Sequence, residues 1–386
     1  MNEYKYVKQL TETNPMFDKY EQYMDLKECY DALKKKENNG FIDTGICNIK
    51  LSPGITVVAG MTGHGKSMLG NSIAYRALKS GLNVAYITLE ISKENMFYQM
   101  ISLRSFSEEP EQNYISHSTI KKRELLPKQE ELVFDKIWPE FKQMSGQLYV
   151  ITEWDFDTTD SVALENKLME VEDYAKSHTS KGIDLIIVDY IQLFKQYKQL
   201  NLTGEYNIIT NWVNDFRKMS LNYLGQNKEI PIVLLSQLNR DAFNDFKKKM
   251  DRDMKNQTIY KYNNDNPYLP NKKIVPEHEV VLSLSQIAGC VEIAKAANQI
   301  ITIYADEELK ASKNCWIQVL KNRDGETKLE PRNEYMNPVY YCVGSNIDMS
   351  KSECLGNYDS IIATGDTVDF NELLRKTDPF AEHERI

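Results

Sequence analysis

The sequence predicts an α/β fold in which a mainly parallel sheet is covered by helices on both faces. From Ile55 onward, short apolar runs alternate with segments of helical spacing or loop composition. The runs cover residues 55–60, 83–90, 147–154, 184–190, 230–238, 299–305 and 315–322. Runs that are apolar on both faces and separated by helices are typical of parallel strands buried on both sides.

Composition limits the class of protein. The chain has 386 residues, enough for one large domain with extensions or for two modest domains. Its longest apolar runs are far shorter than a bilayer crossing requires, and residues 1–10 lack the apolar core of a signal peptide. Six cysteines occur without a CxxC pair, which favours neither a disulfide framework nor a zinc site. We therefore expect a cytoplasmic protein with no membrane partner.

Three regions differ in pattern. Residues 1–45 form an N-terminal segment in which 18–37 carry apolar side chains at spacings of three and four, the pattern of an amphipathic helix. That helix packs either on its own domain or on a neighbouring subunit. Residues 46–343 form the main domain, with a long loop at 240–280. Residues 344–386 are predicted to form an acidic, flexible tail, either featureless or a docking peptide.

A phosphate-binding loop follows the first apolar run. The pattern G-x-x-x-x-G-K-[ST] is matched by Gly60, Met61, Thr62, Gly63, His64, Gly65, Lys66 and Ser67. Glycines let the backbone curl so that N–H groups point at phosphates, and the following helix adds its positive end. Lys66 is predicted to reach the β- and γ-phosphates, and the Ser67 hydroxyl to bind Mg²⁺. The sequence thus predicts ATP, or another nucleoside triphosphate, and Mg²⁺ as ligands.

Two carboxylates lie where such a site needs them. Asp189 ends the run "DLIIVD", and a carboxylate at the end of a neighbouring strand is expected to hold the metal. Asp184 lies at the start of the same run, which is the wrong end. Glu90 ends "NVAYITLE", at the edge where open α/β sheets bind ligands, and is the candidate base that orients the attacking water.

The order of motifs resembles a known family. "GMTGHGKS", "YITLEIS", "LIIVDYIQL", "LLSQLNRD" and "VLKNRDG" follow one another as in the RecA-like motor domain of DnaB-type replicative helicases, over about residues 40–343. The resemblance implies a catalytic role for Glu90 and a metal-binding role for Asp189. It further implies that Gln237 senses the γ-phosphate and links it to DNA contact.

The same resemblance assigns two cations to a neighbouring subunit. Lys321 and Arg323 in "LKNRDG" are similar to the pair that such helicases insert into the adjacent active site, and a solvated hairpin is the alternative for this segment. An arginine supplied in trans neutralises charge on the transferred phosphoryl group. The implied active unit is a homo-oligomeric ring, most simply a hexamer.

Candidate DNA contacts are less well defined by the sequence. The net charge of −9 requires any nucleic-acid site to be local or to be concentrated by a ring. Residues 240–273 contain nine basic and five acidic residues, with Lys247, Lys248 and Lys249 in a row and aromatic residues interleaved. Such a segment either lines a DNA-binding pore or is a solvated loop. Gly289 echoes the family's DNA-binding loop, although Asn298 replaces the usual aspartate and the spacing differs.

The function that follows is an NTP-driven helicase that moves on single-stranded DNA and unwinds duplexes. The resemblance implies single-stranded DNA, further copies of the chain, and primase or other replisome proteins as partners, in a bacterial cell or phage-infected host. Two alternatives remain open at this stage. One is a RecA-like recombination or repair ATPase that forms filaments, and the other is an NTP-gated scaffold or loader in DNA replication.

Overall fold

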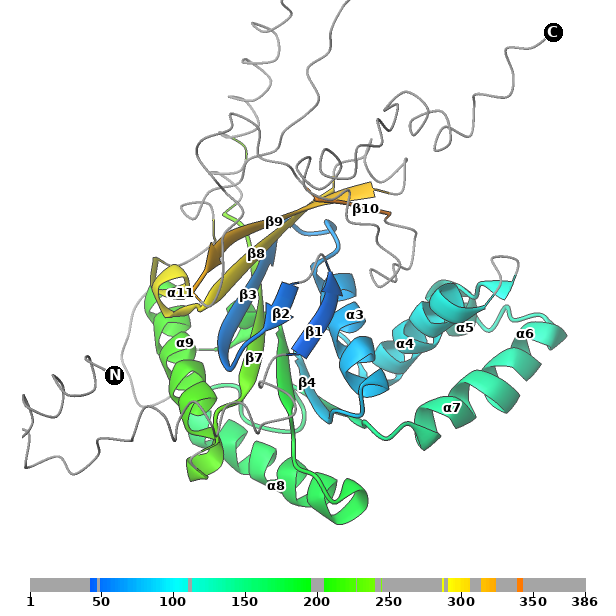
Figure 1. Ribbon diagram of the computed structural model, residues 1–386, viewed down its shortest axis with the longest axis horizontal. Coiled ribbons are helices and arrows are strands. Elements are labelled where there is room, and N and C mark those ends of the chain that lie inside the picture. The colour runs from blue at the N-terminus through cyan, green and yellow to red at the C-terminus, as the bar shows by residue number, and fades with distance from the viewer. Residues whose placement is uncertain are drawn as a thin grey trace, which may run out of the picture. The chain divides into compact units, whose positions relative to one another are not determined.

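The fold is an eight-stranded sheet between two layers of helices (Figure 1). The computed structural model describes residues 42–46, 49–109, 113–195, 205–226, 228–239, 244, 287, 291–305, 314–323 and 339–342. The predicted helix over 18–37, nearly all of the predicted loop at 240–280, and the predicted tail at 344–386 lie outside these residues. The strand order in the sheet is β10-β9-β8-β3-β7-β6-β4-β5.

Six parallel strands form most of the sheet, as predicted. They are β3 (Gly54–Gly60), β4 (Val84–Thr88), β5 (Leu148–Thr152), β6 (Leu185–Asp189), β7 (Pro231–Gln237) and β8 (Gln299–Tyr304). Every residue of β3, β4, β6 and β8 is buried, which explains why these strands are continuous apolar runs in the sequence. The sequence prediction located each of them to within two residues at either end.

Three further features could not be predicted. Strand β9 (Asn314–Asn322) runs antiparallel to β8, and β10 (Val339–Cys342) runs antiparallel to β9. Strands β1 (Ile42–Ile46) and β2 (Ile49–Leu51) form a separate antiparallel pair beside α3 (Lys66–Lys79). A hydrophobic run carries no information on the direction of its strand, so the sheet is mixed at this edge while remaining mainly parallel, as predicted.

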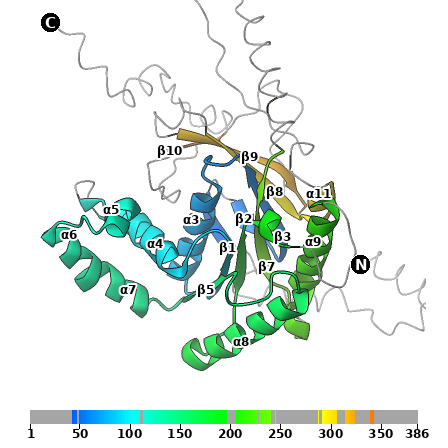
Figure 2. The same ribbon diagram turned by 180° about the vertical axis from the view of Figure 1, so that it is seen from behind.

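Alternating side chains of the strands bury two faces. On one face, Val58 and Ile187 pack against α3 and α4 (Lys93–Glu108). On the other, Val57 and Val188 pack against α8 (Ser161–Thr179), α9 (Glu205–Leu221) and α11 (Val291–Ala296). Figures 1 and 2 show α3 and α4 on one side of the sheet and α8 and α9 on the other. The period of two along each strand therefore decides which layer a side chain meets.

A helical arm leads from α4 to the edge strand β5. It contains α5 (His117–Lys122), α6 (Pro127–Glu131), a π-helical segment (Leu132–Ile137) and α7 (Trp138–Gln143), and it projects away from the sheet in both views (Figures 1 and 2). Ile115, Val133 and Ile137 of the arm form a small core together with Ile101 of α4. None of the helices in the described part of the chain is both long and apolar enough for a membrane crossing.

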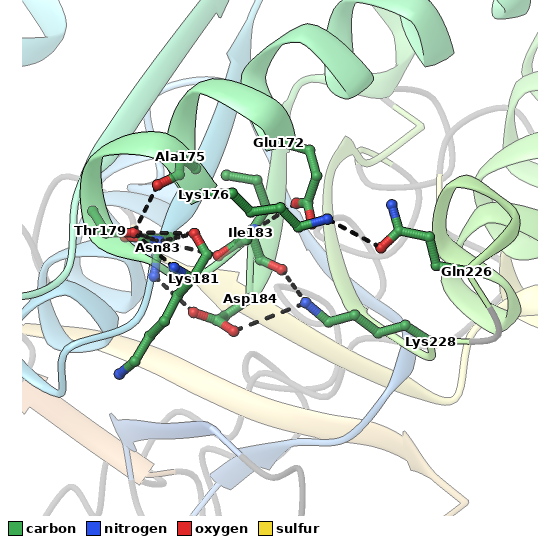
Figure 3. A network of polar contacts seen from close by, with 11 residues as sticks. Asn83, Glu172, Ala175, Lys176, Thr179, Lys181, Ile183, Asp184, Gln226 and Lys228 are labelled. Carbon is green, nitrogen blue, oxygen red and sulfur yellow. Dashed lines mark hydrogen bonds and ion pairs between the residues drawn. The ribbon is translucent and has the colours of Figure 1, made fainter.

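A polar network joins the amino ends of three parallel strands (Figure 3). The backbone N–H of Asn83, just before β4, donates to the Asp184 carboxylate, just before β6, at 3.0 Å. The Lys228 ammonium, just before β7, donates to the Ile183 carbonyl at 2.6 Å. Asp184 thus lies at the end of the sheet where the sequence predicted it, and it has a structural partner there.

Glu172 of α8 is the buried acid of this network. Its side chain is only 2% exposed, accepts a hydrogen bond from the Ile183 backbone N–H at 2.6 Å, and pairs with the Lys176 ammonium at 3.0 Å. A Cβ added at Gly182 would lie 2.0 Å from a Glu172 oxygen, so a larger residue there would displace this carboxylate. The carboxylate therefore fixes the turn between α8 and β6.

We expect Glu172→Ala to lower the free energy of unfolding by about 2–4 kcal/mol, because a buried N–H loses its acceptor and a cavity remains. Urea denaturation followed by circular dichroism measures this loss. Glu170→Ala is the matched control, since that carboxylate lies two residues earlier on the same helix, is 70% exposed and pairs with Lys167. The control is expected to cost less than about 0.5 kcal/mol, and equal losses for the two variants would contradict this role of Glu172.

Candidate nucleotide-binding site

The carboxyl ends of four neighbouring strands, β3, β7, β6 and β4, bring the predicted site residues to one edge of the sheet. Gly60 of β3 lies opposite Gln237 of β7, and Thr88 of β4 lies opposite Asp189 of β6. Strand β7 lies between β3 and β6, which puts Gln237 between the phosphate-binding loop and the candidate metal carboxylate. Gln237 and Asp189 each lie two residues after a side chain that packs in the same cluster as α3, namely Leu235 and Ile187. Because side chains alternate along a strand, Gln237 and Asp189 are on the face of the sheet that α3 covers.

The loop between β3 and α3 has the conformation that its glycines allow. Gly63 and Gly65 have φ angles of 78° and 98°, in the left-handed region that favours glycine. A Cβ at Gly60 would lie 2.9 Å from the Ile303 carbonyl oxygen, so β3 and β8 approach too closely there for any other residue. No side chain caps the N-terminus of α3, whose first N–H groups are in position to bind an anion.

Lys66 begins α3 and reaches back over the loop. Its side chain donates a hydrogen bond to the Met61 carbonyl at 2.9 Å, and the residue is 7% exposed. Burial lowers the pKa of its ammonium, while the negative charges of Asp189 and Glu90 oppose that shift. A buried ammonium beside the loop at the start of a helix is suited to neutralise a bound anion.

Asp189 ends β6 with a buried carboxylate. Its Oδ2 accepts a hydrogen bond from the Tyr86 hydroxyl at 3.4 Å, whereas Oδ1 is buried without a hydrogen-bond partner. Burial raises the pKa of Asp189 to about 6; Ser67, Lys66 and Tyr86 lower it and Glu90 raises it further. A buried carboxylate oxygen without a donor is an unsatisfied ligand. Together with the hydroxyl of Ser67 it fits a hard cation such as Mg²⁺.

Glu90 lies just beyond β4 and is exposed. Its charge is close enough to act on Asp189, Lys66 and Tyr86. The N-cap of α4 is Ser92, which accepts a hydrogen bond from the Asn95 N–H, so the cap does not require Glu90. The carboxylate is therefore at the same edge as the loop and Asp189, and it is in contact with solvent.

The loop is also tied to strand β8. The imidazole of His64 accepts a hydrogen bond from the Ala305 N–H at 3.3 Å and packs edge-on against the Tyr304 ring at 5.1 Å between centroids. His64 was predicted only as a variable position of the loop motif. Its contacts link the loop to the strand that pairs with β9.

Two residues of the site were not singled out from the sequence. Tyr86 is fully buried, and burial followed by the charge of Asp189 raises the pKa of its phenol well above the ordinary value. Gln192 lies in a 3₁₀ turn (Ile191–Leu193) after β6 and bonds to the end of β7. A signal existed in each case, because a tyrosine within a buried strand and a glutamine within an apolar run both require polar partners.

Lys321 and Arg323 lie away from this edge within one chain. The N–H of Arg323 donates to the carbonyl of Asn298, immediately before β8, whereas the loop adjoins Ile303 near the other end of β8. Five residues of strand separate these points, which is about 16 Å. Both side chains bind carbonyls of α11, Lys321 at Ala294 and Arg323 at Lys295. Burial, with the charges of Arg323 and Arg217, lowers the pKa of Lys321.

The candidate DNA contacts Lys247, Lys248, Lys249 and Gly289 lie outside the described residues. The substituted position Asn298 is described, and its side chain donates to the Pro53 carbonyl at 3.4 Å. Its backbone N–H donates to the Ile55 carbonyl at 2.7 Å. In this chain Asn298 therefore joins the start of β8 to the start of β3, far from the loop.

The fold and the loop define a class of protein first. The sheet is mainly parallel, the phosphate-binding loop follows β3, and β7 lies between β3 and β6, the strand that ends at Asp189. This arrangement is a RecA-like P-loop fold. Residues 49–331 match the model of the family described as DnaB-like helicase C terminal domain. That range is well over half of the chain, and the chain belongs to this family.

Two solved structures have a similar fold. One is a DnaB-like replicative helicase, described with its interactions with primase, at 14% identity and a TM-score of 0.55 over 82% of this chain. This chain spans 62% of the length of that protein. Another is the ATPase domain of G40P, at 14% identity and a TM-score of 0.58, covering 86% of this chain and 97% of that domain. A comparison with curated proteins found no similar sequence.

We expect Asp189→Asn to stabilise the metal-free protein at pH 8. A carboxyl whose pKa rises to about 6 on folding binds protons more tightly when folded, so stability falls as pH rises from about 4 to 6 and the loss is complete above that range. Keeping this charge buried costs roughly 3 kcal/mol, and the amide removes the cost.

The measurement is urea denaturation of both proteins in chelator at pH 4.5 and pH 8. The variant should gain about 1–3 kcal/mol at pH 8 and much less at pH 4.5. Asp173→Asn, on the exposed face of α8, is the control and should change stability by less than about 0.5 kcal/mol at either pH. A stability gain of Asp189→Asn that is the same at both pH values would show that ionisation of Asp189 does not destabilise the folded chain.

Proposed function

We propose that this chain is the motor of an ATP-dependent replicative DNA helicase, a homo-oligomeric ring that moves on single-stranded DNA and unwinds duplexes. The observation that carries the proposal is the buried edge at which Lys66, Ser67 and Asp189 meet beside a loop of backbone amides. Membership of the DnaB-like helicase family supports the reaction class.

Each residue of the edge has a task in NTP hydrolysis. The loop amides and Lys66 bind the β- and γ-phosphates, and Glu90 orients the attacking water from the solvent side. Ser67 and Asp189 would hold Mg²⁺, which would supply positive charge to stabilise the phosphates. Gln237, at the end of the strand between the loop and Asp189, is in position to respond to loss of the γ-phosphate.

Lys321 and Arg323 act in trans in this proposal. Within one chain they lie at the opposite end of β8 from the loop, so a second copy must bring them to a bound triphosphate. A contact that joins one edge of a subunit to a different edge of the next is heterologous, and it closes into a ring when the rotation allows. The basic segment with Lys247, Lys248 and Lys249 is the proposed lining that binds DNA in that ring.

Unwinding of a forked duplex, measured beside ATP hydrolysis with and without single-stranded DNA, tests the proposal. The wild-type chain should unwind the fork and hydrolyse ATP faster with DNA. Lys66→Ala should lose both activities by at least about a hundredfold, because the anion loses its buried counter-charge. DNA-stimulated hydrolysis without unwinding, together with filaments in electron micrographs, would instead favour a recombination ATPase.

Mixing two inactive variants tests the trans arrangement. Arg323→Ala alone should lower hydrolysis by about a thousandfold, and Lys66→Ala alone should abolish it. An equal mixture should recover hydrolysis at about a quarter of subunit boundaries, where an intact loop meets an intact Arg323. Lys218→Ala, at a side chain that is 79% exposed, is the control and should behave as wild type. A mixture that stays inactive would contradict the arrangement.

A further inference from the structure

The end of β7 is held from both sides by bonds that alternate along its backbone. The N–H of Gln237 donates to the Oε1 of Gln192 at 3.2 Å, on the side of β6. The next N–H, of Leu238, donates to the carbonyl of Gly60 at 3.2 Å, on the side of β3 and the phosphate-binding loop. Consecutive N–H groups of a strand point in opposite directions, so these two bonds fix the orientation of the backbone that carries the Gln237 side chain.

The Gln192 side chain bonds to β7 beyond the point where the backbone pairing of β6 and β7 ends. The ladder between β6 and β7 stops at Val188 and Leu234, three residues before Gln237. Beyond it, the Nε2 of Gln192 donates to the buried hydroxyl of Ser236 at 2.8 Å, while its Oε1 accepts from Gln237. A side-chain amide has both a donor and an acceptor, as a peptide group has, and here it bonds to two consecutive residues of β7.

The turn that carries Gln192 is itself firmly anchored. Ile191, the first residue of the turn, and Phe194, just after it, are buried in the core at 1% and 5% exposure. The Phe194 ring lies 4.3 Å from the ring of Trp212 on α9, and the Trp212 indole donates to the Lys195 carbonyl at 3.0 Å. Gln192 is thus fixed to the segment that follows Asp189, and its bonds carry the position of that segment to Gln237.

We propose that Gln192 is a positioning residue that holds Gln237 in a fixed position relative to Asp189 and so couples nucleotide state to DNA-stimulated hydrolysis. The proposal rests on the proposed function of this edge. Gln192 acts on the reaction through Gln237 and leaves the loop that binds the phosphates intact. Its loss should therefore affect turnover and the response to DNA far more than the affinity for nucleotide.

The test compares wild type with Gln192→Leu, which is of similar size and makes neither bond. Turnover with single-stranded DNA should fall about tenfold, while the Kd for a fluorescent ATP analogue stays within about twofold. Gln147→Leu is the matched control, because that amide is also half-buried and donates to the Met144 carbonyl, but at the amino end of β5. The control should keep wild-type turnover and affinity.

Gln192→Glu separates positioning from general stability. A carboxylate can accept hydrogen bonds from both the Gln237 N–H and the Ser236 hydroxyl, so this variant should keep turnover within about threefold of wild type. Turnover of the leucine variant within about twofold of wild type would overturn the proposal. So would a leucine variant whose turnover, nucleotide affinity and melting temperature fall together, because that pattern indicates only a structural role.

Hydrogen exchange gives a readout that does not depend on hydrolysis. A peptide covering residues 236–239 should exchange faster in Gln192→Leu than in wild type, and ATP analogue should slow its exchange in wild type only. If the wild-type protein neither hydrolyses ATP nor unwinds DNA, the proposed function is refuted. The difference in exchange between wild type and Gln192→Leu would still show whether Gln192 holds the end of β7. Equal exchange in the two proteins would overturn the inference.

Discussion

The site depends on one electrostatic constraint: a carboxylate and an ammonium are both buried at the carboxyl edge of the sheet. Lys66 is 7% exposed and Asp189 is 2% exposed, and the charge of each opposes the pKa shift that burial imposes on the other. Removing charges from water costs free energy that their mutual attraction recovers only in part. The Oδ1 of Asp189 is also buried without a hydrogen-bond partner, which adds to the free-energy cost of this edge.

That cost is tolerated because the sheet itself is rigid. Parallel strands place Gly60, Gln237 and Asp189 at one edge by register alone, and alternation along each strand turns Gln237 and Asp189 toward the same helix layer. No loop has to fold over the site to assemble these three positions. Preorganisation by strand register is the physical reason why open α/β sheets bind ligands at their carboxyl ends.

The sequence predicted the parallel strands and the place of the glycine-rich loop between β3 and α3, because each has a local signature. Buried parallel strands are continuous apolar runs, and the residues that end them, such as Asp189, are visible as polar breaks. What could not be predicted depends on contacts between distant segments. The antiparallel direction of β9 places Lys321 and Arg323 at the edge opposite the loop, and nothing in "LKNRDG" specifies that direction. The roles of Tyr86 and Gln192 likewise depend on which strands become neighbours.

The network around Glu172 and Asp184 has a consequence for how the domain responds to its ligands. Side chains join the starts of β4, β6 and β7 at one end of the sheet, whereas the other end carries a buried charge that lacks part of its solvation. The two ends therefore differ in local stability, and opening fluctuations should begin at the carboxyl end. A ligand that binds the folded domain at that end would stabilise the whole domain by mass action.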